Sequence, residues 1–378
     1  MSYDFLHGLA TFGIIPFLIV LTIIVFFHEL GHFLVARWCG VKVVTFSIGF
    51  GPELFGFNDR HDTRWKVCAV PLGGYVKFFG DENAASVPDH AAAAAMGEDE
   101  RRVSFVHQNV GARSAIVVAG PVANFILSIV LFAGIFMSIG RPVVPARIDE
   151  VVPESAAAAA GLQAGDLIVA IDGRPVSGFA EMQRIVAGSS GHTLTLTVDR
   201  SGARTDIKAT PATSGFCNAV LGIKKTRADE VKLQTERPDA ALVLGVEETY
   251  FVIERSLCFV AGVIVGRESA NQLGGPIRIA EAAGDAWKSG LDSGGLGTAI
   301  AQLLYLSGFL SASIGLLNLF PIPLLDGGHL LFFAVEAVRG RPLSERAQEF
   351  GFRIGLAIVV MLMLFATKND ILAKFGID

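Results

Sequence analysis

The sequence predicts a polytopic α-helical membrane protein of about four transmembrane helices that carries a water-soluble α+β insert. Its 378 residues are 52% hydrophobic and only 18% charged, whereas soluble domains average about 25% charged residues. Phenylalanine outnumbers tyrosine by 28 to 4, which suits a lipid-facing surface because the phenylalanine ring has no polar group. Several apolar segments reach the length of about 20 residues that a bilayer-spanning helix needs. Together these observations favour the membrane class.

The candidate spans divide the chain into membrane and soluble parts. The apolar segments cover residues 12–35, 115–140, 300–320 and 352–366, and the last of them is the shortest. The domain organisation that follows is a first span in 1–36, a loop in 37–113, a second span in 114–140, a small domain in 141–212, a linker with a surface helix in 213–299, a third span in 300–338, and a loop, fourth span and tail in 339–378.

The basic residues predict the orientation of these parts. Lysine and arginine concentrate in 37–113 and again in 339–353. The positive-inside rule therefore places both loops in the cytoplasm and residues 141–299 outside the membrane. The net charge of −5 shows no basic excess, so nucleic acid is not expected as a partner, whereas membrane lipid is.

The first loop contains two runs rich in β-branched and aromatic residues. Residues 41–57 and 64–80 are punctuated by glycine and proline, which predicts strands and hairpins. We therefore expect a cytoplasmic, membrane-associated β-loop. The acidic, alanine-rich segment 81–100 that follows predicts a mobile stretch or a short exposed helix.

The outer region opens with the signals of a small α+β domain. "AAAGLQAGDLIVAIDGRPV", residues 158–176, combines a turn, a strand and an Asp-Gly hairpin signal. A helix and an alternating strand follow, and the order resembles a PDZ domain of the bacterial kind. PDZ domains bind peptides by adding a strand to a sheet edge, so the resemblance implies one periplasmic PDZ domain with peptide contact, and a steric lid is the alternative.

Residues 239–266 are nearly long enough to span a membrane but carry four charged residues near their middle. We expect an amphipathic helix on the outer membrane surface. The four cysteines are widely spaced and form no Cys-x-x-Cys pair, which predicts neither a disulfide framework nor a thiolate zinc site. They are interpreted as small apolar filler, with a Cys217–Cys258 bridge as the alternative. The remaining two are Cys39 and Cys68.

The first span contains "HELGH", residues 28–32, in the middle of an apolar run. On a helix, His28 and His32 share one face, so both imidazoles can reach one metal ion. Zinc in catalytic sites takes three protein ligands and a water, and a neighbouring carboxylate such as Glu29 can act as general base. Polar groups at membrane depth are costly and usually mark function. The pattern therefore predicts metal binding.

A second polar site ends the third span, in "NLFPIPLLDGGH", residues 318–329. Pro321 and Pro323 break the helix, and backbone groups freed at membrane depth survive only against protein or a polar cavity. Asp326 in such a cavity supplies a third metal ligand; the competing interpretation is that Asp326 only caps the next helix. His329 is interpreted as a helix-end histidine rather than a ligand.

These motifs together resemble the site-2 protease family of intramembrane zinc metalloproteases, in particular its bacterial RseP branch. The resemblance rests on HELGH, "FSIGFGP", "VPLGGYVKF", "AGPVANF", "LGGPIRIAEAAGDA" and "NLFPIPLLDGGHLLF". It implies Zn2+ as cofactor, held by His28, His32 and Asp326, with Glu29 as general base. It departs from the familiar enterobacterial members in showing one PDZ domain where they carry two.

The resemblance also implies a substrate and a place in the cell. Substrates would be single-pass transmembrane proteins, such as an anti-sigma factor of an envelope stress response or remnant signal peptides. The protein would be a multi-pass component of the bacterial inner membrane with its PDZ domain in the periplasm. Substrate binding is implied for a loop of Gly73, Gly74 and Tyr75 and for a path shaped by Asn318, Pro321 and Pro323.

Two other classes of function compete with this reading. Histidine and carboxylate at membrane depth also suit a metal transporter, but a transporter needs polar residues along a whole path, and the spans show one polar layer. A non-enzymatic PDZ scaffold with a degenerate protease core would not need Glu29, His28, His32 and Asp326 intact.

Overall fold

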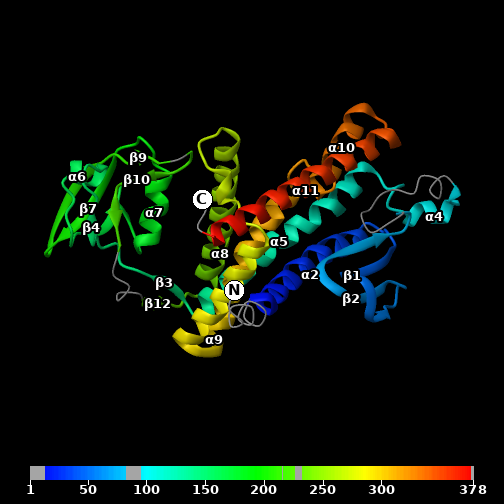
Figure 1. The fold of residues 1–378 in the computed structure, drawn as a ribbon, viewed down its shortest axis with the longest axis horizontal. Helices are drawn as coiled ribbons and strands as arrows, with labels where there is room; N and C mark the ends of the chain where they lie inside the picture. Colours follow the sequence, from blue (N-terminus) through cyan, green and yellow to red (C-terminus); the bar gives the residue numbers. More distant parts are fainter. Residues whose placement is uncertain (1–12, 82–94, 215, 226–231, 376–378) are drawn as a thin grey trace. The chain divides into compact units, whose positions relative to one another are not determined.

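The computed structural model describes residues 13–81, 95–214, 216–225 and 232–375. The chain forms two compact units (Figure 1). The first comprises Met1–Phe132, Leu244–Thr249 and Asn271–Asp378, and the second comprises Ala133–Val243 and Tyr250–Ala270.

Four helices in the described part of the chain are long and apolar enough to cross a membrane, as the sequence predicts. The third is longer than expected and is interrupted at Gly295, whose φ of 74° is not helical. Position 12 of the expected first span lies outside the described residues. The helices are α2 (Ile15–Trp38), α5 (Val110–Ser138), α9 (Pro276–Asn318) and α11 (Glu345–Lys374).

The spanning helices of the first unit pack through apolar and small side chains. Val20 and Ile24 of α2 are buried against Ala283 and Leu303 of α9. Gly308 of α9 faces a phenylalanine ring of α5, so that an added Cβ would lie 3.0 Å from it. Small residues at such positions let membrane helices approach closely, where dispersion forces and hydrogen bonds replace the hydrophobic effect. This packing brings α2, α5 and α9 together.

The predicted strands of the first loop form a small sheet of β1 (Val43–Asn58) and β2 (Arg64–Phe78), in which residues 45–48 of β1 pair with both 64–67 and 74–77 of β2. Phe46 and Val76 are buried on α2 in one cluster with Phe33. The segment of Gly73, Gly74 and Tyr75, expected as a loop, lies inside β2 instead. Gly74 and Tyr75 keep strand geometry because they pair with Ile48 and Ser47 of β1.

The turn between β1 and β2 is organised by Asp59. Burial alone would raise the pKa of its carboxyl, but hydrogen bonds from the Trp65 indole and the backbone of His61 and Thr63, with the charge of Arg37, lower this pKa to about 2. Most of the acidic segment 81–100 lies outside the described residues; its end forms the short exposed helix α4 (Glu98–Val103).

The second unit contains the predicted small α+β domain, with the expected order of strand, hairpin, helix and strand. A four-stranded sheet has the order β6-β5-β7-β8. Ile168, Met182 and Leu196 are buried in a core that also includes Leu221. Its elements are β3 (Arg141–Val143), β4 (Glu150–Val151), α6 (Ala156–Ala159), β5 (Leu167–Ile171), β6 (Arg174–Pro175), α7 (Phe179–Ala187), β7 (Leu194–Arg200), β8 (Ala203–Ala209), β9 (Ala212–Thr213), β10 (Ala219–Val220), β11 (Ile223–Lys224) and β12 (Lys232–Gln234).

The turn that contains the Gly-Leu-Gln-Ala-Gly-Asp string is held by an ion pair. Arg200 Nε lies 2.7 Å from Asp166 Oδ1, and this hydrogen bond holds the pKa of the buried Asp166 carboxyl below its ordinary value. The motif that suggested the domain therefore has a structural role in joining the turn to β7.

The apolar segment after this domain forms one helix, α8 (Pro238–Ile264), followed by the 3-10 turn η2 (Ala270–Gln272). Helix α8 is not among the four candidate spans of the described residues. Its place on the membrane surface stays a prediction. Within the first unit, Glu248 is buried and accepts a hydrogen bond of 2.9 Å from the Tyr305 hydroxyl, which ties α8 to α9.

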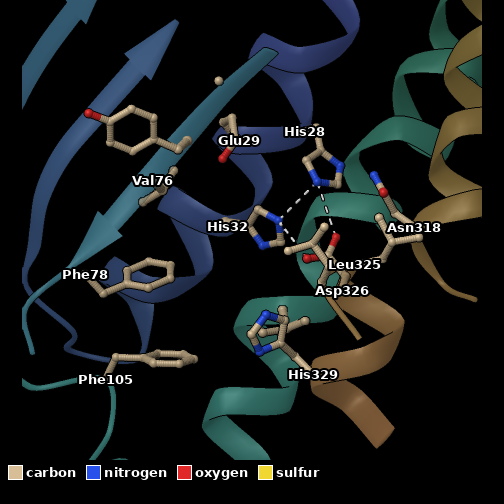
Figure 2. Close-up of a pocket in the computed structure, with 14 residues that line it drawn as sticks. His28, Glu29, His32, Val76, Phe78, Phe105, Asn318, Leu325, Asp326 and His329 are labelled. Carbon is tan, nitrogen blue, oxygen red and sulfur yellow. Dashed lines mark hydrogen bonds and ion pairs between the residues drawn. The ribbon is translucent and has the colours of Figure 1, made fainter. Parts of the chain in front are cut away.

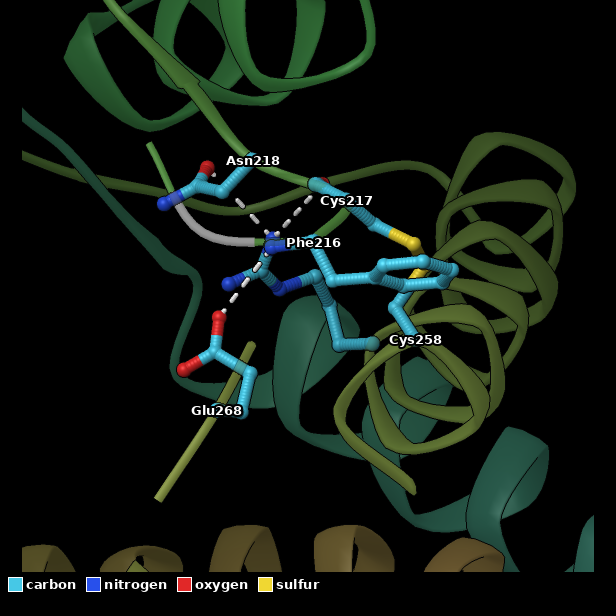
Figure 3. Close-up of a disulfide and its surroundings, with 6 residues drawn as sticks. Phe216, Cys217, Asn218, Cys258 and Glu268 are labelled. Atoms are coloured by element: carbon cyan, nitrogen blue, oxygen red, sulfur yellow. Dashed lines mark hydrogen bonds between the residues drawn. A yellow bond between two sulfur atoms is a disulfide. The ribbon is translucent and has the colours of Figure 1, made fainter. Parts of the chain in front are cut away.

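Cys217 and Cys258 form a disulfide (Figure 3), so the preferred reading of these two as apolar filler is wrong. Spacing could not decide this because 41 residues separate them. They meet because one face of α8 docks on the small domain. On that face Phe251 lies under the Arg184 guanidinium, 4.4 Å from the ring centroid to the guanidinium carbon, and Arg255 is 3.5 Å from the Cys217 carbonyl oxygen.

We expect Cys258→Ser to lower the free energy of unfolding of the second unit by about 2–4 kcal/mol, because the bridge closes a long loop in the unfolded chain. The check is denaturant-dependent hydrogen exchange of the β7 peptide, with Cys39→Ser in the first unit as control. Thiol labelling of denatured, unreduced protein should modify Cys39 and Cys68 but not the bridged pair. Unchanged exchange in Cys258→Ser would contradict a stabilising bridge.

Candidate metal centre

His28 and His32 lie one helical turn apart on α2 and turn their rings to the same side (Figure 2). Their Nε2 atoms are 3.3 Å apart. At a rise of about 1.5 Å per residue, His28 is roughly 20 Å from the first residue of α2 and roughly 15 Å from the last. The pair therefore lies near the middle of a helix that is long enough to cross a membrane.

Asp326 faces the two histidines from the start of helix α10 (Asp326–Arg339). One carboxylate oxygen lies 3.3 Å from His28 Nε2, and the other lies 3.5 Å from His32 Nε2. The three side chains offer ligand atoms that all lie within 4.8 Å of one another. The long-range pairing predicted between the two polar motifs is present.

These separations suit a zinc ion. Two ligands at about 2.0–2.2 Å from zinc and at a tetrahedral angle are themselves roughly 3.4 Å apart. The two imidazole nitrogens are 3.3 Å apart, and each has its nearer Asp326 oxygen, a different one for each ring, at 3.3 or 3.5 Å. Two imidazoles and one carboxylate are also a known ligand set of catalytic zinc, which keeps its fourth position open. The side chains present therefore fit the metal.

Glu29 lies beside this cluster and is held by β2. Glu29 and Val76 of β2 line the same wall of the pocket (Figure 2). Gly74 makes this approach of strand and helix feasible, because a Cβ there would lie 3.2 Å from Glu29 Cγ and 2.8 Å from Val25 Cγ1. Glu29 is thus fixed next to the ligands without being one of the three.

The cluster opens into a cavity of about 190 Å³. Of the residues expected to bind substrate, Asn318, Gly74 and Tyr75 line this cavity. Gly73, Pro321 and Pro323 are not among its lining residues. The full lining is His28, Glu29, His32, Gly74, Tyr75, Val76, Phe78, Phe105, Val117, Asn318, Leu324, Leu325, Asp326 and His329.

The two prolines instead form the turn between α9 and α10. Helix α9 ends at Asn318, and the irregular segment through Pro321 and Pro323 delivers Asp326 to the first position of α10. The predicted break of the helix is confirmed, while a direct part of these prolines in a substrate path stays a prediction. His329 lies in the first turn of α10 with its ring near Phe333 and Phe352, as expected of a helix-end histidine.

Tyr75 connects the cavity to a basic side chain on β2. The ammonium of Lys66 lies 5.4 Å from the centre of the Tyr75 ring. A side-chain hydrogen bond with Tyr75 holds the pKa of Lys66 above its ordinary value. Lys66 therefore stays charged next to Tyr75, which lines the cavity.

Helix α5 supplies a wall of the metal centre that sequence reasoning missed. His32 Nδ1 lies 2.8 Å from the carbonyl oxygen of Ile116. One turn later, Gly120 leaves room for both imidazoles, because a Cβ there would lie 2.9 Å from His28 Cε1 and still closer to the His32 ring. The signal in the sequence was the Gly-Pro pair followed by Asn124, a polar residue within an apolar span.

The model of the family "Peptidase family M50" matches residues 16–362. The chain belongs to peptidase family M50. This is the site-2 protease family of zinc metalloproteases, as the shared motifs predicted. The peptidase is 47% identical over 368 residues to a "putative zinc metalloprotease" of Mesorhizobium japonicum, covering 95% of this chain and 98% of the relative.

Other relatives of this M50 peptidase are also similar along nearly their whole length. One from Rhizobium meliloti, again named "putative zinc metalloprotease", is 44% identical over 369 residues, covering 95% of this chain and 96% of the relative. Metalloprotease MmpA of Caulobacter vibrioides is 38% identical over 382 residues, 95% of either chain. Zinc is therefore the cofactor of this peptidase family.

Proposed function

We propose that this M50 peptidase is an intramembrane endopeptidase that hydrolyses a peptide bond within or beside the span of a single-pass membrane protein. The observation that carries the proposal is the meeting of His28, His32 and Asp326 with Glu29 in one cavity, at mid-length of a membrane-crossing helix. In this proposal His28, His32 and Asp326 hold the zinc ion.

When bound, zinc would polarise the scissile carbonyl and lower the pKa of a water molecule toward 7. Glu29 is placed to take a proton from the attacking water and to return it to the leaving nitrogen. Close packing of its Cγ against Gly74 of β2 restricts where the carboxylate can point. Phe78, Phe105 and Val117 give the cavity an apolar wall that limits access of bulk water.

A transmembrane substrate hides its peptide bonds within its own helix, so hydrolysis requires an extended segment. Residues 74–77 of β2 pair with residues 45–48 of β1 on one side, and their other side is proposed as an edge where a strand could add. Gly74 and Tyr75 lie on this strand and line the cavity. We propose that Gly73, Gly74 and Tyr75 pair with the unwound substrate, while Asn318, Pro321 and Pro323 shape the path into the site.

The small domain of the second unit is proposed to be a periplasmic PDZ domain that filters substrates by size or contacts their ends. Its element order and the Asp166-containing turn support a PDZ domain. The Cys217–Cys258 bridge supports an oxidising compartment, and the thiols Cys39 and Cys68 belong to the part proposed to face the cytoplasm. The protein would then be a multi-pass component of a bacterial inner membrane.

The proposed substrates are membrane-tethered anti-sigma factors in an envelope stress response, or remnant signal peptides. Both are single apolar spans that have lost their bulky outer part, which suits a cavity beside a strand edge. A size-filtering outer domain would admit them and exclude intact membrane proteins.

The test is cleavage of a single-span model substrate by the purified chain in proteoliposomes. We expect cleavage within the span, its loss on treatment with a chelator, and its return when zinc is added. The control is the same span fused to a large folded outer domain, which we expect to be cleaved more slowly. Unchanged cleavage after verified zinc removal would contradict a zinc-dependent mechanism, and zinc flux without cleavage would favour a transporter.

A further inference from the structure

Each histidine of the metal centre has one ring nitrogen directed at the ligand cluster and one at helix α5. For His32, the hydrogen-bond partner on helix α5 is unambiguous. The carbonyl oxygen of Ile116 can only accept, so His32 Nδ1 carries the proton in the 2.8 Å hydrogen bond. His32 Nε2 is left with a free lone pair, which is the form that a metal ligand needs.

For His28, the hydrogen-bond partner on helix α5 is the side chain of Asn124. The amide lies 3.3 Å from His28 Nδ1, with its nitrogen as the nearer atom. Asn124 is fully buried, and its Oδ1 has no hydrogen-bond partner within the described part of the chain. A buried amide oxygen without a donor is costly.

The orientation of this amide decides which nitrogen of His28 is protonated. If Asn124 Nδ2 donates to Nδ1, the proton of the neutral ring moves to Nε2, the atom that faces His32 and Asp326. If the amide is rotated by 180°, Oδ1 accepts the Nδ1 proton, gains a donor and leaves Nε2 free. The two orientations differ only in the hydrogen-bond network that they satisfy. The ligand cluster requires the second.

The packing around Asn124 keeps its side chain next to His28. The hydroxyl of Ser311 on α9 donates to the backbone carbonyl of Asn124 over 2.8 Å. Gly315, one turn further along α9, lies so close that a Cβ there would be 3.1 Å from Asn124 Cβ. Helix α9 therefore presses on α5 at this residue.

We propose that Asn124 is a positioning residue for the metal centre, whose side-chain oxygen accepts the His28 Nδ1 proton and selects the metal-binding tautomer. Ile116, Gly120 and Asn124 follow at intervals of four residues on α5, so one helical stripe holds both rings. The inference rests on the proposed zinc site.

The test measures zinc affinity rather than proteolysis, by competition with a chromophoric chelator on the purified full chain. Asn124→Leu keeps the approximate volume but removes the acceptor, and we expect it to weaken zinc binding by about 10–100-fold. Asn124→Asp keeps an acceptor oxygen, so its affinity should stay within a few-fold of wild type. Ser128→Ala, one turn further along α5 and also buried, is the matched control and should leave the affinity unchanged.

The outcomes separate this inference from the proposed function. A wild-type chain that does not bind zinc would overturn the metal centre itself. Wild-type affinity in Asn124→Leu, or a loss in Asn124→Asp as large as in Asn124→Leu, would overturn the role of Asn124 while leaving the metal centre in place. If Asn124→Leu does not fold, as judged by gel filtration and helical circular dichroism, Asn124→Ala takes its place under the same criteria.

Discussion

Glu29→Gln is expected to lower the turnover number for a single-span substrate by about 10²–10⁴-fold, the range that a general base contributes. Glutamine has nearly the shape of glutamate, but its neutral amide cannot take a proton from water at neutral pH. His28, His32 and Asp326 are unchanged, so the zinc content should stay at the wild-type level.

The measurements are single-turnover cleavage and metal content on the same preparation. Glu349→Gln is the matched control, because Glu349 is exposed and pairs with Arg353 one turn along α11. Cleavage by Glu29→Gln at the wild-type rate, with zinc retained, would rule out Glu29 as the base. Loss of zinc would instead mean that Glu29 supports the metal.

The second large effect is expected from Gly120→Ala, a substitution in α5 that adds one methyl group. The new Cβ would lie 2.5 Å from His32 Cε1 and 2.9 Å from His28 Cε1, so neither ring could keep its position. We expect zinc affinity to fall by at least tenfold and cleavage by roughly 100-fold or more, because displacements of about 1 Å carry costs of this size.

Gly134→Ala is the control for this prediction. Gly134 lies on the same helix, and apart from the adjacent backbone of α5 no described atom lies within 4 Å of an added Cβ. Alanine is a better helix former than glycine by about 1 kcal/mol, so neither variant should weaken α5 itself. Normal zinc binding in Gly120→Ala would show that the rings are not held as the structure places them.

These variants probe two different parts of the site. Glu29 acts on the reacting groups, whereas Gly120 acts only through the space that it leaves for the ligands. Glu29→Gln should lose turnover but keep zinc, whereas Gly120→Ala should lose zinc. This pair of results would separate proton transfer from metal binding. Asn124 belongs with Gly120 among the residues that position the ligands, because it faces His28 as Ile116 faces His32.

The polar motifs could be predicted from the sequence because their geometry is local. A helix places residues four positions apart on one face, so His28 and His32 had to converge, with Glu29 beside them. The four spans follow from length and apolar content alone. The helix break before Asp326 follows from Pro321 and Pro323, since proline cannot donate the backbone hydrogen bond of a helix interior.

Tertiary structure decided the features that depend on distant segments. Asp326 lies beside the histidines only because α10 packs next to α2. Ile116, Gly120 and Asn124 contact the imidazole rings because α5 packs against α2 at the same level. Gly74 and Tyr75 lie in a strand because β1 pairs with them, and Cys217 meets Cys258 because α8 docks on the small domain. Local sequence determines which groups share one helix face, whereas packing across many elements determines which faces meet.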